Sequence, residues 1–496
     1  MKIRPGPVAA VLLLVLLGAW IYFQEYRGAA QREEAERQRE RPLQFARPEV
    51  TSIRLENGAG AFLLQRQEEA WRLVEPLDTA ADKEAVEGIL SALEYARIER
   101  RIGSGDDLKP YGLESPRATL TLGLAGDDAA QILRIGEQAP IGANCFALLP
   151  GDGGVALVSA SLQDLAQKNL LSLRDKSLVD LDAWNVRSLR IERGAETVVL
   201  TRSDSGWKLQ SPVEAPADGP LVTDLLNEID RLQASAFLSE APAAADLARY
   251  RLDRPAARLT VQEEGWESGK TIWFGATVDE GRAARVGGAG PVVAVTETFW
   301  PKVTTSLFDL RRKDILALNR YRVRGLTVTR LGGEPLSLRH GGEGAWTATG
   351  MVEGSVAGSS VELLLAHISD LKATAFMDRP SERQREELAR QPALDLSLEE
   401  EPASEEGEPP VQHLLIGEPD QNAQVKVRDL SWEPIALAPA GVYERILRQL
   451  DAIIEEIRSP PAAEKAADDP GDGAASSGDD RAVENPKVEP ERDGDR

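Results

Sequence analysis

The 496-residue sequence is poor in the residue types that most often carry chemistry or lock a fold. It has one cysteine, Cys145, and three histidines, and aromatic residues make up only 5% of the chain. A single cysteine excludes an intramolecular disulfide. Few aromatics, together with 42 glycines and 30 prolines, are typical of short strands joined by many turns.

Positive charge is also in deficit. The chain has 58 lysines and arginines against 81 aspartates and glutamates, which gives a formal net charge of −23. A surface this negative repels phosphate backbones, so nucleic acid is excluded as a partner. The length and an apolar content of 42% are enough for several domains with cores of their own.

An uncharged apolar run lies near the N-terminus, over residues 8–23, and the basic residues Lys2 and Arg4 precede it. This pattern predicts a transmembrane helix over residues 7–26, with residues 1–6 in the cytoplasm and the bulk of the chain outside. The competing interpretation is a cleaved signal peptide, whose apolar region spans about 7–15 residues. Both interpretations export the rest of the chain.

Two charged segments flank the part of the chain that can form cores. Residues 27–42 are dense in Glu and Arg, which indicates a solvated helical stalk that Pro42 ends. Residues 459–496 contain 11 acidic and 5 basic residues without apolar periodicity. Such a composition predicts a disordered acidic tail.

Between these segments the sequence repeats itself three times. Trp71, Trp207 and Trp346 are separated by 136 and 139 residues, and each follows residues with the alternation of half-buried strands. We take these tryptophans as core anchors rather than a ligand platform. The predicted repeats are residues 43–180, 181–317 and 318–458, of which the last is the most diverged.

Each repeat has an apolar stripe at helical spacing after its tryptophan. The stripe residues are Val86, Ile89, Leu90 and Leu93 in the first copy, Val222, Leu225, Leu226 and Ile229 in the second, and Val361, Leu364, Leu365 and Ile368 in the third. This spacing predicts a helix that covers one face of a sheet. Asp82 and Asp218 stand where they can cap the first two helices.

Further strands and a closing helix complete each repeat. The closing helices are expected at Leu162 to Leu173, Phe299 to Leu310 and Val442 to Ile457. In the third copy six glutamates between residues 399 and 408 fit a longer solvated hairpin loop better than a cation site. The fold class expected is α+β, with one N-terminal transmembrane helix, three tandem β-rich repeats of antiparallel sheets with packed helices, and the acidic tail.

No residue pattern supports catalysis or a cofactor. His340, His367 and His413 have no partner at metal-ligand spacing. The segment from Gly265 to Thr271 resembles the end of a phosphate-binding loop, but one residue is missing between its glycines and a strand-like run follows it. Catalytic, cofactor-binding and metal sites are therefore predicted to be none, and we expect the protein not to be an enzyme.

Two further features of the sequence are interpreted as structural rather than functional. Cys145 is expected to be a small buried strand residue, and its counterpart in the second copy is taken as Ala284. The runs Leu173–Leu178 and Leu310–Ile315 join one repeat to the next. Their arginines and lysines are interpreted as charges at a helix C-terminus followed by a linker, with ligand binding as the lesser alternative.

The repeat resembles a known family. The pattern is a Trp-x-Leu strand end, a Val-x-x-Ile/Leu-Leu-x-x-Leu helix, Tyr-Gly-Leu-x-x-Pro-x-Ala-Thr, Ile-Gly-Glu and Leu-Arg-Asp-Lys, and it is similar to the bacterial domain of unknown function 4340 over roughly residues 45–457. In the second copy Arg251 replaces the Gly of Tyr-Gly-Leu and Ala276 replaces the Glu of Gly-Glu. The family contributes no catalytic residues.

The resemblance implies a single-pass protein of the bacterial inner membrane, with most of the chain periplasmic. The anchor, the repeats, the acidic tail and the lack of a catalytic pattern favour a scaffold or accessory subunit of a membrane complex, and family analogy suggests a gliding-type ABC export system and its permease. The alternative is a module that binds a cell-wall glycan or another envelope ligand. Cofactors are expected to be none.

Overall fold

A computed structural model of the chain describes residues 20, 22, 40–103, 107–126, 130–151, 154–316, 318–341, 345–402 and 409–459. They form two compact units, which divide between Arg312 and Lys313. The predicted transmembrane helix (except Trp20 and Tyr22), the stalk up to residue 39 and the tail from residue 460 lie outside the described residues. Within the described part of the chain, no helix combines the length and the hydropathy needed to cross a bilayer.

The first module runs from Arg47 to Leu173 and is built on a nine-stranded antiparallel sheet. Its strands are β1 (Val50–Asn57), β2 (Gly60–Gln67), β3 (Ala70–Glu75), β4 (Thr79–Ala80), β5 (Ile98–Gly103), β6 (Ala118–Leu124), β7 (Gln131–Gln138), β8 (Cys145–Leu148) and β9 (Val155–Val158). Its helices are η1 (Arg47–Glu49), α2 (Lys83–Tyr95), η2 (Lys109–Tyr111), η3 (Ala160–Gln167) and α3 (Leu170–Leu173).

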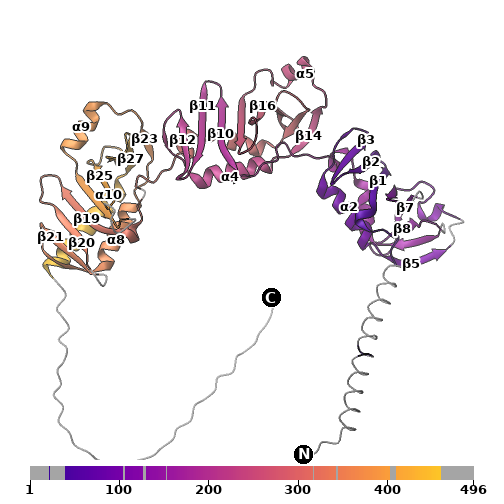
Figure 1. Cartoon of the computed structure of the whole chain (residues 1–496), viewed down its shortest axis with the longest axis horizontal. Coiled ribbons are helices and arrows are strands. Elements are labelled where there is room, and N and C mark those ends of the chain that lie inside the picture. Colours follow the sequence, from indigo (N-terminus) through magenta and orange to yellow (C-terminus); the bar gives the residue numbers. More distant parts are fainter. Residues whose placement is uncertain are drawn as a thin grey trace, which may run out of the picture. The chain divides into compact units, whose positions relative to one another are not determined.

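The second module runs from Val186 to Leu310 and repeats this plan. Its strands are β10 (Val186–Arg193), β11 (Glu196–Ser203), β12 (Gly206–Ser211), β13 (Ala215–Pro216), β14 (Ala234–Ser239), β15 (Ala257–Glu263), β16 (Lys270–Val278), β17 (Gly281–Val286) and β18 (Val292–Val295). Its helices are α4 (Gly219–Asp230), α5 (Ala244–Arg249), η4 (Glu297–Phe299), α6 (Trp300–Val303) and α7 (Leu307–Leu310). Figure 1 shows α4 lying along one side of the sheet.

The third module, from Arg320 to Arg458, belongs to the second compact unit. Its strands are β19 (Val323–Arg330), β20 (Leu336–His340), β21 (Trp346–Gly350), β22 (Gly354–Val356), β23 (Ala375–Met377), β24 (Leu394–Glu400), β25 (Val411–Ile416), β26 (Gln424–Asp429) and β27 (Ile435–Pro439). Its helices are η5 (Arg320–Arg322), α8 (Gly358–Ser369), α9 (Glu382–Arg390) and α10 (Ala440–Arg458).

The three sheets have one topology. In the first, the strand order is β4-β3-β2-β1-β6-β7-β8-β9-β5, and the other two repeat it strand for strand. The central pair in each sheet is interrupted at the same place, between Val50 and Ser52, between Val186 and Ser188, and between Val323 and Gly325. The prediction of three tandem β-rich repeats with antiparallel sheets is therefore confirmed.

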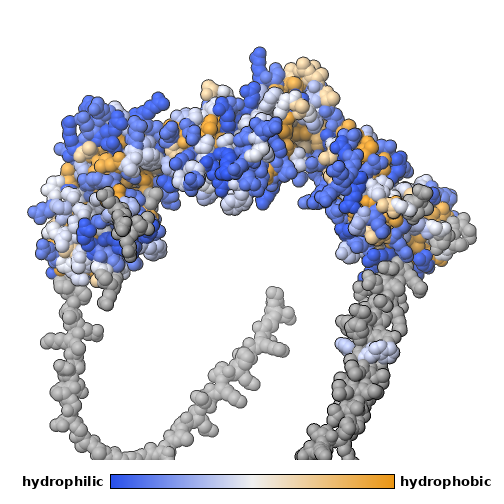
Figure 2. Space-filling model, viewed as in Figure 1, coloured by the Kyte–Doolittle hydropathy of each residue, from blue (hydrophilic) through white to orange (hydrophobic). Residues whose placement is uncertain are grey.

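The helical stripes read from the sequence face the cores. All twelve predicted stripe residues of α2, α4 and α8 are buried. Asp82 caps α2 by accepting from the Ala85 N–H at 2.9 Å, and Asp218 caps α4 by accepting from the Leu221 N–H at 3.1 Å. On the visible face of each module the surface is mainly hydrophilic with small apolar patches (Figure 2).

The predicted closing helices are wrong in two of the three modules. The segment expected to be one helix from Leu162 to Leu173 is η3 followed by α3, because Asn169 opens a new helix with its own capping box. In the second module Pro301 lies in the first turn of α6 and Ser306 caps α7 separately. In the third module α10 is continuous over 19 residues, as predicted.

Some elements were not anticipated. Strands β5, β14 and β23 follow the helices α2, α4 and α8. They pair with β9, β18 and β27, respectively. Helices α5 and α9 were also missed, although a Ser381–Gln384 capping box marks the start of α9 in the sequence.

Candidate functional site

The three histidines all lie in the third module, and two of them have a partner within it. The His340 ring on β20 meets the Trp346 ring edge-on, with the centroids 5.1 Å apart. The His413 ring on β25 pairs with Asp395 on the neighbouring strand. His367 lies on α8. In the part of the chain that the structure describes, no group of three or more His, Cys, Asp or Glu residues is placed to hold a metal ion.

Cys145 is buried on β8, as predicted, and desolvation raises the pKa of its thiol to about 11. The thiol is therefore protonated at neutral pH and is a poor nucleophile. Its predicted counterpart was wrong. In the first sheet Cys145 pairs with Val158. At the same place in the second sheet Arg282 pairs with Val295, so the counterpart of Cys145 is Arg282 rather than Ala284.

The three repeated tryptophans and the segment near Gly265 have structural roles. Trp71, Trp207 and Trp346 are buried. The segment near Gly265 is the hairpin between β15 and β16, with no helix after it. The Lys270 ammonium lies 4.2 Å from the Trp266 ring centroid and donates to the Asp180 carbonyl, so its donors are directed to the protein itself.

The linker between the first two modules, residues 174–178, is bonded on both sides. The Asp175 N–H donates to the Ala80 carbonyl at 3.0 Å on the first module. On the second module the Ala234 N–H donates to the Lys176 carbonyl at 2.8 Å, and the Leu178 N–H donates to the Leu232 carbonyl. The linker is therefore an extra strand-like segment that joins two module edges within one compact unit.

Charged side chains reinforce this linker. Arg174 is only 5% exposed; its Nη1 lies 2.5 Å from Glu240 Oε1, and its guanidinium carbon lies 3.3 Å from the Phe237 ring centroid. Lys176 pairs with Asp82, the cap of α2. The prediction of a charge at a helix C-terminus followed by a linker is confirmed, because Arg174 is the C-cap of α3. The sequence did not predict that the buried Arg174 side chain also contacts the second module. Its partner lies 66 residues further along the chain, so local sequence gave no signal.

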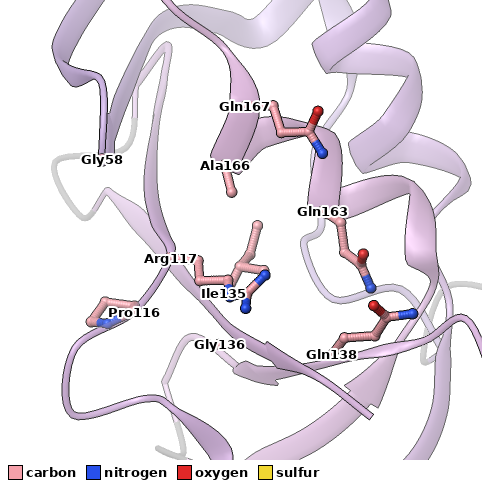
Figure 3. A pocket seen from close by; sticks show the side chains of 9 residues that line it. All are labelled: Gly58, Pro116, Arg117, Ile135, Gly136, Gln138, Gln163, Ala166 and Gln167. Carbon is pink, nitrogen blue, oxygen red and sulfur yellow. The ribbon is translucent and has the colours of Figure 1, made fainter. Parts of the chain in front are cut away.

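A cavity of about 370 Å³ opens in the first module (Figure 3). Its polar lining comes mainly from the amides of Gln138, Gln163 and Gln167, and the side chains of Gln138 and Gln163 approach one another. Arg117, also in the lining, is paired with Glu137 at 2.5 Å. Neutral amides can donate and accept hydrogen bonds but do not transfer protons near neutral pH. This cavity offers polar recognition without acid–base chemistry.

A groove of about 390 Å³ lies on the third module, between η5, the β20–β21 hairpin and α8. Tyr321 is 72% exposed at its rim, and Leu363 on α8 is 47% exposed. Trp346 and His340 form its wall. Polar groups complete the lining: Arg320, Arg324, Ser359 and Glu362.

This groove places aromatic rings beside positively and negatively charged side chains that can form hydrogen bonds. Such a combination is typical of a ligand-binding site. The Arg324 guanidinium is already engaged by Glu401 at 2.7 Å, and the Arg320 Nη2 donates to the Tyr321 hydroxyl at 2.8 Å. The sequence reasoning missed the groove, because its residues come from three separated segments. Two of the lining residues, His340 and Trp346, give no signal of a groove when each is considered alone.

Comparison with known proteins adds a family and no function. No curated protein and no solved structure matches the chain. A family model described as Domain of unknown function (DUF4340) matches residues 71–208 and 207–392, a shorter span than the sequence resemblance suggested. The matches begin at Trp71 in β3 and Trp207 in β12, so the family's unit starts inside one sheet and ends inside the next. With more than half of its length matched, the chain belongs to the DUF4340 family.

Proposed function

We propose that the protein is a non-enzymatic scaffold or accessory subunit of a bacterial envelope complex. The apolar run over residues 8–23 anchors it in the inner membrane, and the modules lie on the periplasmic side. By analogy with its family, the complex is a gliding-type ABC export system, and the partner is its permease. The proposal concerns attachment and spacing rather than a chemical reaction.

The observation that carries this proposal is the linker between the first two modules. A flexible tether would leave its backbone groups to water, whereas residues 175, 176 and 178 exchange hydrogen bonds with both modules. The contact between the buried Arg174 and the partly exposed Glu240 adds a specific restraint at the same place. A pair of modules fixed in this way presents two sheets to a partner as one body, which is what a scaffold requires.

The test is photo-crosslinking in intact cells, followed by solubilisation and identification of the partners by mass spectrometry. We expect an ABC permease or another envelope protein to be recovered through the modules. A matched control replaces residues 1–26 with an unrelated single-span anchor, and we expect the same partner to be captured. Recovery of no envelope partner by either chain contradicts the proposal.

A second candidate function is the binding of an envelope ligand, and one specific observation favours it. The groove on the third module combines the exposed Tyr321 ring with Trp346 and with charged groups of both signs. A cleft lined with aromatic residues is the feature that separates a ligand-binding module from a purely structural repeat. The two functions are compatible, because the linker and the groove lie on different parts of the chain.

A further inference from the structure

The groove of the third module occupies a seam that the first module keeps closed. In the first module Arg47 on η1 crosses this seam and reaches α2. Its Nη1 lies 2.8 Å from Glu87 Oε2, its Nε lies 2.7 Å from Glu94 Oε2, and its Nη2 donates to the Ser91 hydroxyl at 2.9 Å. One guanidinium therefore makes three contacts that fill the space between the turn and the helix.

The third module has the arginine but not the matching helix. Aligning the first strands, Val50 with Val323, places Arg320 at the position of Arg47. Aligning the buried stripes of α2 and α8 places Glu362, Ala366 and Ser369 at the positions of Glu87, Ser91 and Glu94. Two of the three acceptors are thus replaced.

With those acceptors replaced, the Arg320 side chain turns elsewhere. Its Nη2 donates to the Tyr321 hydroxyl, and its guanidinium carbon lies 4.9 Å from the Tyr321 ring centroid. The seam it leaves is the groove of about 390 Å³. The opening is therefore a consequence of two changed residues on α8.

Position 321 itself has changed in a way that suits binding. The first module has Pro48 there, and the second has Trp184, which is 76% exposed. The Arg202 guanidinium lies 5.7 Å from the Trp184 ring centroid. The third module differs from the second in placing its exposed ring at the rim of a groove, and aromatic side chains are common in the lining of ligand sites.

We propose that the groove of the third module binds an N-acetylated oligosaccharide. The proposal rests on the ligand-binding function named above as the second candidate. The Tyr321 ring offers an exposed face for the C–H face of a pyranose ring. The exposed methyl groups of Leu363, close to the Trp346 wall, suit the methyl of an acetamido group.

The polar groups in the groove match a neutral polyhydroxylated ligand. Sugar hydroxyls and amides donate and accept, so they need partners of both kinds: the Arg320 guanidinium donates, the Glu362 carboxylate accepts, and the Ser359 hydroxyl does both. Arg324 is neutralised by Glu401, which leaves Arg320 and Glu362 to balance one another. A strongly anionic polymer would meet no net positive field there, on a chain whose formal net charge is −23.

The test is calorimetric titration of the full-length protein in detergent with the hexamer of N-acetylglucosamine. We expect saturable binding, and we expect Tyr321→Ala to weaken it about tenfold. Tyr321 is 72% exposed, so this change leaves the fold intact, which circular dichroism checks. Trp184→Ala is the matched control, because it removes the exposed ring at the aligned position of the second module, and it should leave the affinity unchanged.

A second variant tests the origin of the groove. The double change Ala366→Ser and Ser369→Glu restores on α8 the acceptors that hold Arg47 in the first module, so Arg320 should cross the seam and binding should be lost. Maltohexaose, which has no acetamido groups, should not bind to the unmodified protein.

Three results overturn the proposal: no binding of the hexamer, equal binding of maltohexaose, or equal losses from Tyr321→Ala and Trp184→Ala. Capture of the envelope partner by crosslinking does not depend on this titration. A failed titration with a captured partner therefore removes the saccharide site and leaves the scaffold function standing.

Discussion

The first and third modules share one sheet topology but close in different ways. The first ends in the short helices η3 and α3 and then enters a linker that is bonded to the next module. The third ends in α10, a 19-residue amphipathic helix whose apolar side is buried. The same sheet topology is therefore completed by different elements, so the topology alone does not fix how a module closes.

The same contrast extends to the start of the stripe helix. In the first module Asp82 caps α2 and is paired with Lys176 of the linker. In the third module Ala357 is at that position, and Glu456 of α10 accepts from the Ala357 N–H at 2.7 Å and from the Ser360 hydroxyl at 2.6 Å. A carboxylate thus accepts hydrogen bonds at the start of both helices, although in the third module it comes from another element. The first module is closed by the linker that follows it, and the third module is closed by its own last helix.

The largest effect is expected from removing the core contact of α10. Ile446→Ala empties a fully buried position in the core of the third module and should cost about 2–5 kcal/mol of its stability. Hydrogen exchange of the full-length protein, read by mass spectrometry, should show lost protection in α8 and α10. Arg448→Ala, an exposed position on the same helix, should change the stability by less than about 0.5 kcal/mol. Equal effects of the two changes would show that α10 does not close the module.

A smaller effect is expected at the linker. Arg174→Met keeps the apolar stem but removes the contacts to Glu240 and the Phe237 ring, which should cost about 1.5–3 kcal/mol locally. Exchange should rise on both sides of the linker, in residues 174–178 and in β14. Glu240→Gln keeps a hydrogen-bond acceptor and should have a weaker effect. Unchanged protection in β14 would mean that Arg174 does not join the modules.

The sequence predicted the features that depend on local periodicity. The stripes of α2, α4 and α8 follow a period of 3.6, and all their members are buried as expected. The caps Asp82 and Asp218 were predicted by their position before these stripes. The continuous α10 was also predicted, because its apolar periodicity runs over the whole segment without a proline.

The features that were missed depend on partners distant in sequence. Strand β5 alternates poorly and is defined by pairing with β9, far along the chain. In the sequence Arg174 cannot be told from any other charged linker residue, because its partner Glu240 is distant along the chain. The groove forms where η5 lies against α8, and these elements are separated in the sequence. The replacement of Ser91 and Glu94 by Ala366 and Ser369 matters because Arg47 contacts both acceptors in the first module. Tertiary pairing, rather than propensity, decides each of these cases.

The smallest effect concerns the ion pair that the first module has at its helix cap. Burial opposes ionisation of Asp82, but hydrogen bonds from Lys176 and from the Ala85 N–H outweigh it and hold the pKa below its usual value. The carboxylate therefore stabilises the module above the unfolded pKa of about 3.9, and this contribution is lost as the pH falls through the lower folded value. Protection of α2 should accordingly persist until the pH falls below about 4.

Lys176→Met tests this ion pair directly. It should cost about 0.2–1 kcal/mol at neutral pH and raise the pKa of Asp82 toward its ordinary value, so that acid loosens α2 at a higher pH than in the unmodified protein. Hydrogen exchange across α2 between neutral and acid pH measures the shift. Asp218→Asn changes the cap of the second module and should leave the acid profile of α2 as it was. If Lys176→Met also leaves that profile unmoved, the linker does not stabilise the cap of α2, and the closure of the first module rests on Arg174 and the backbone bonds alone.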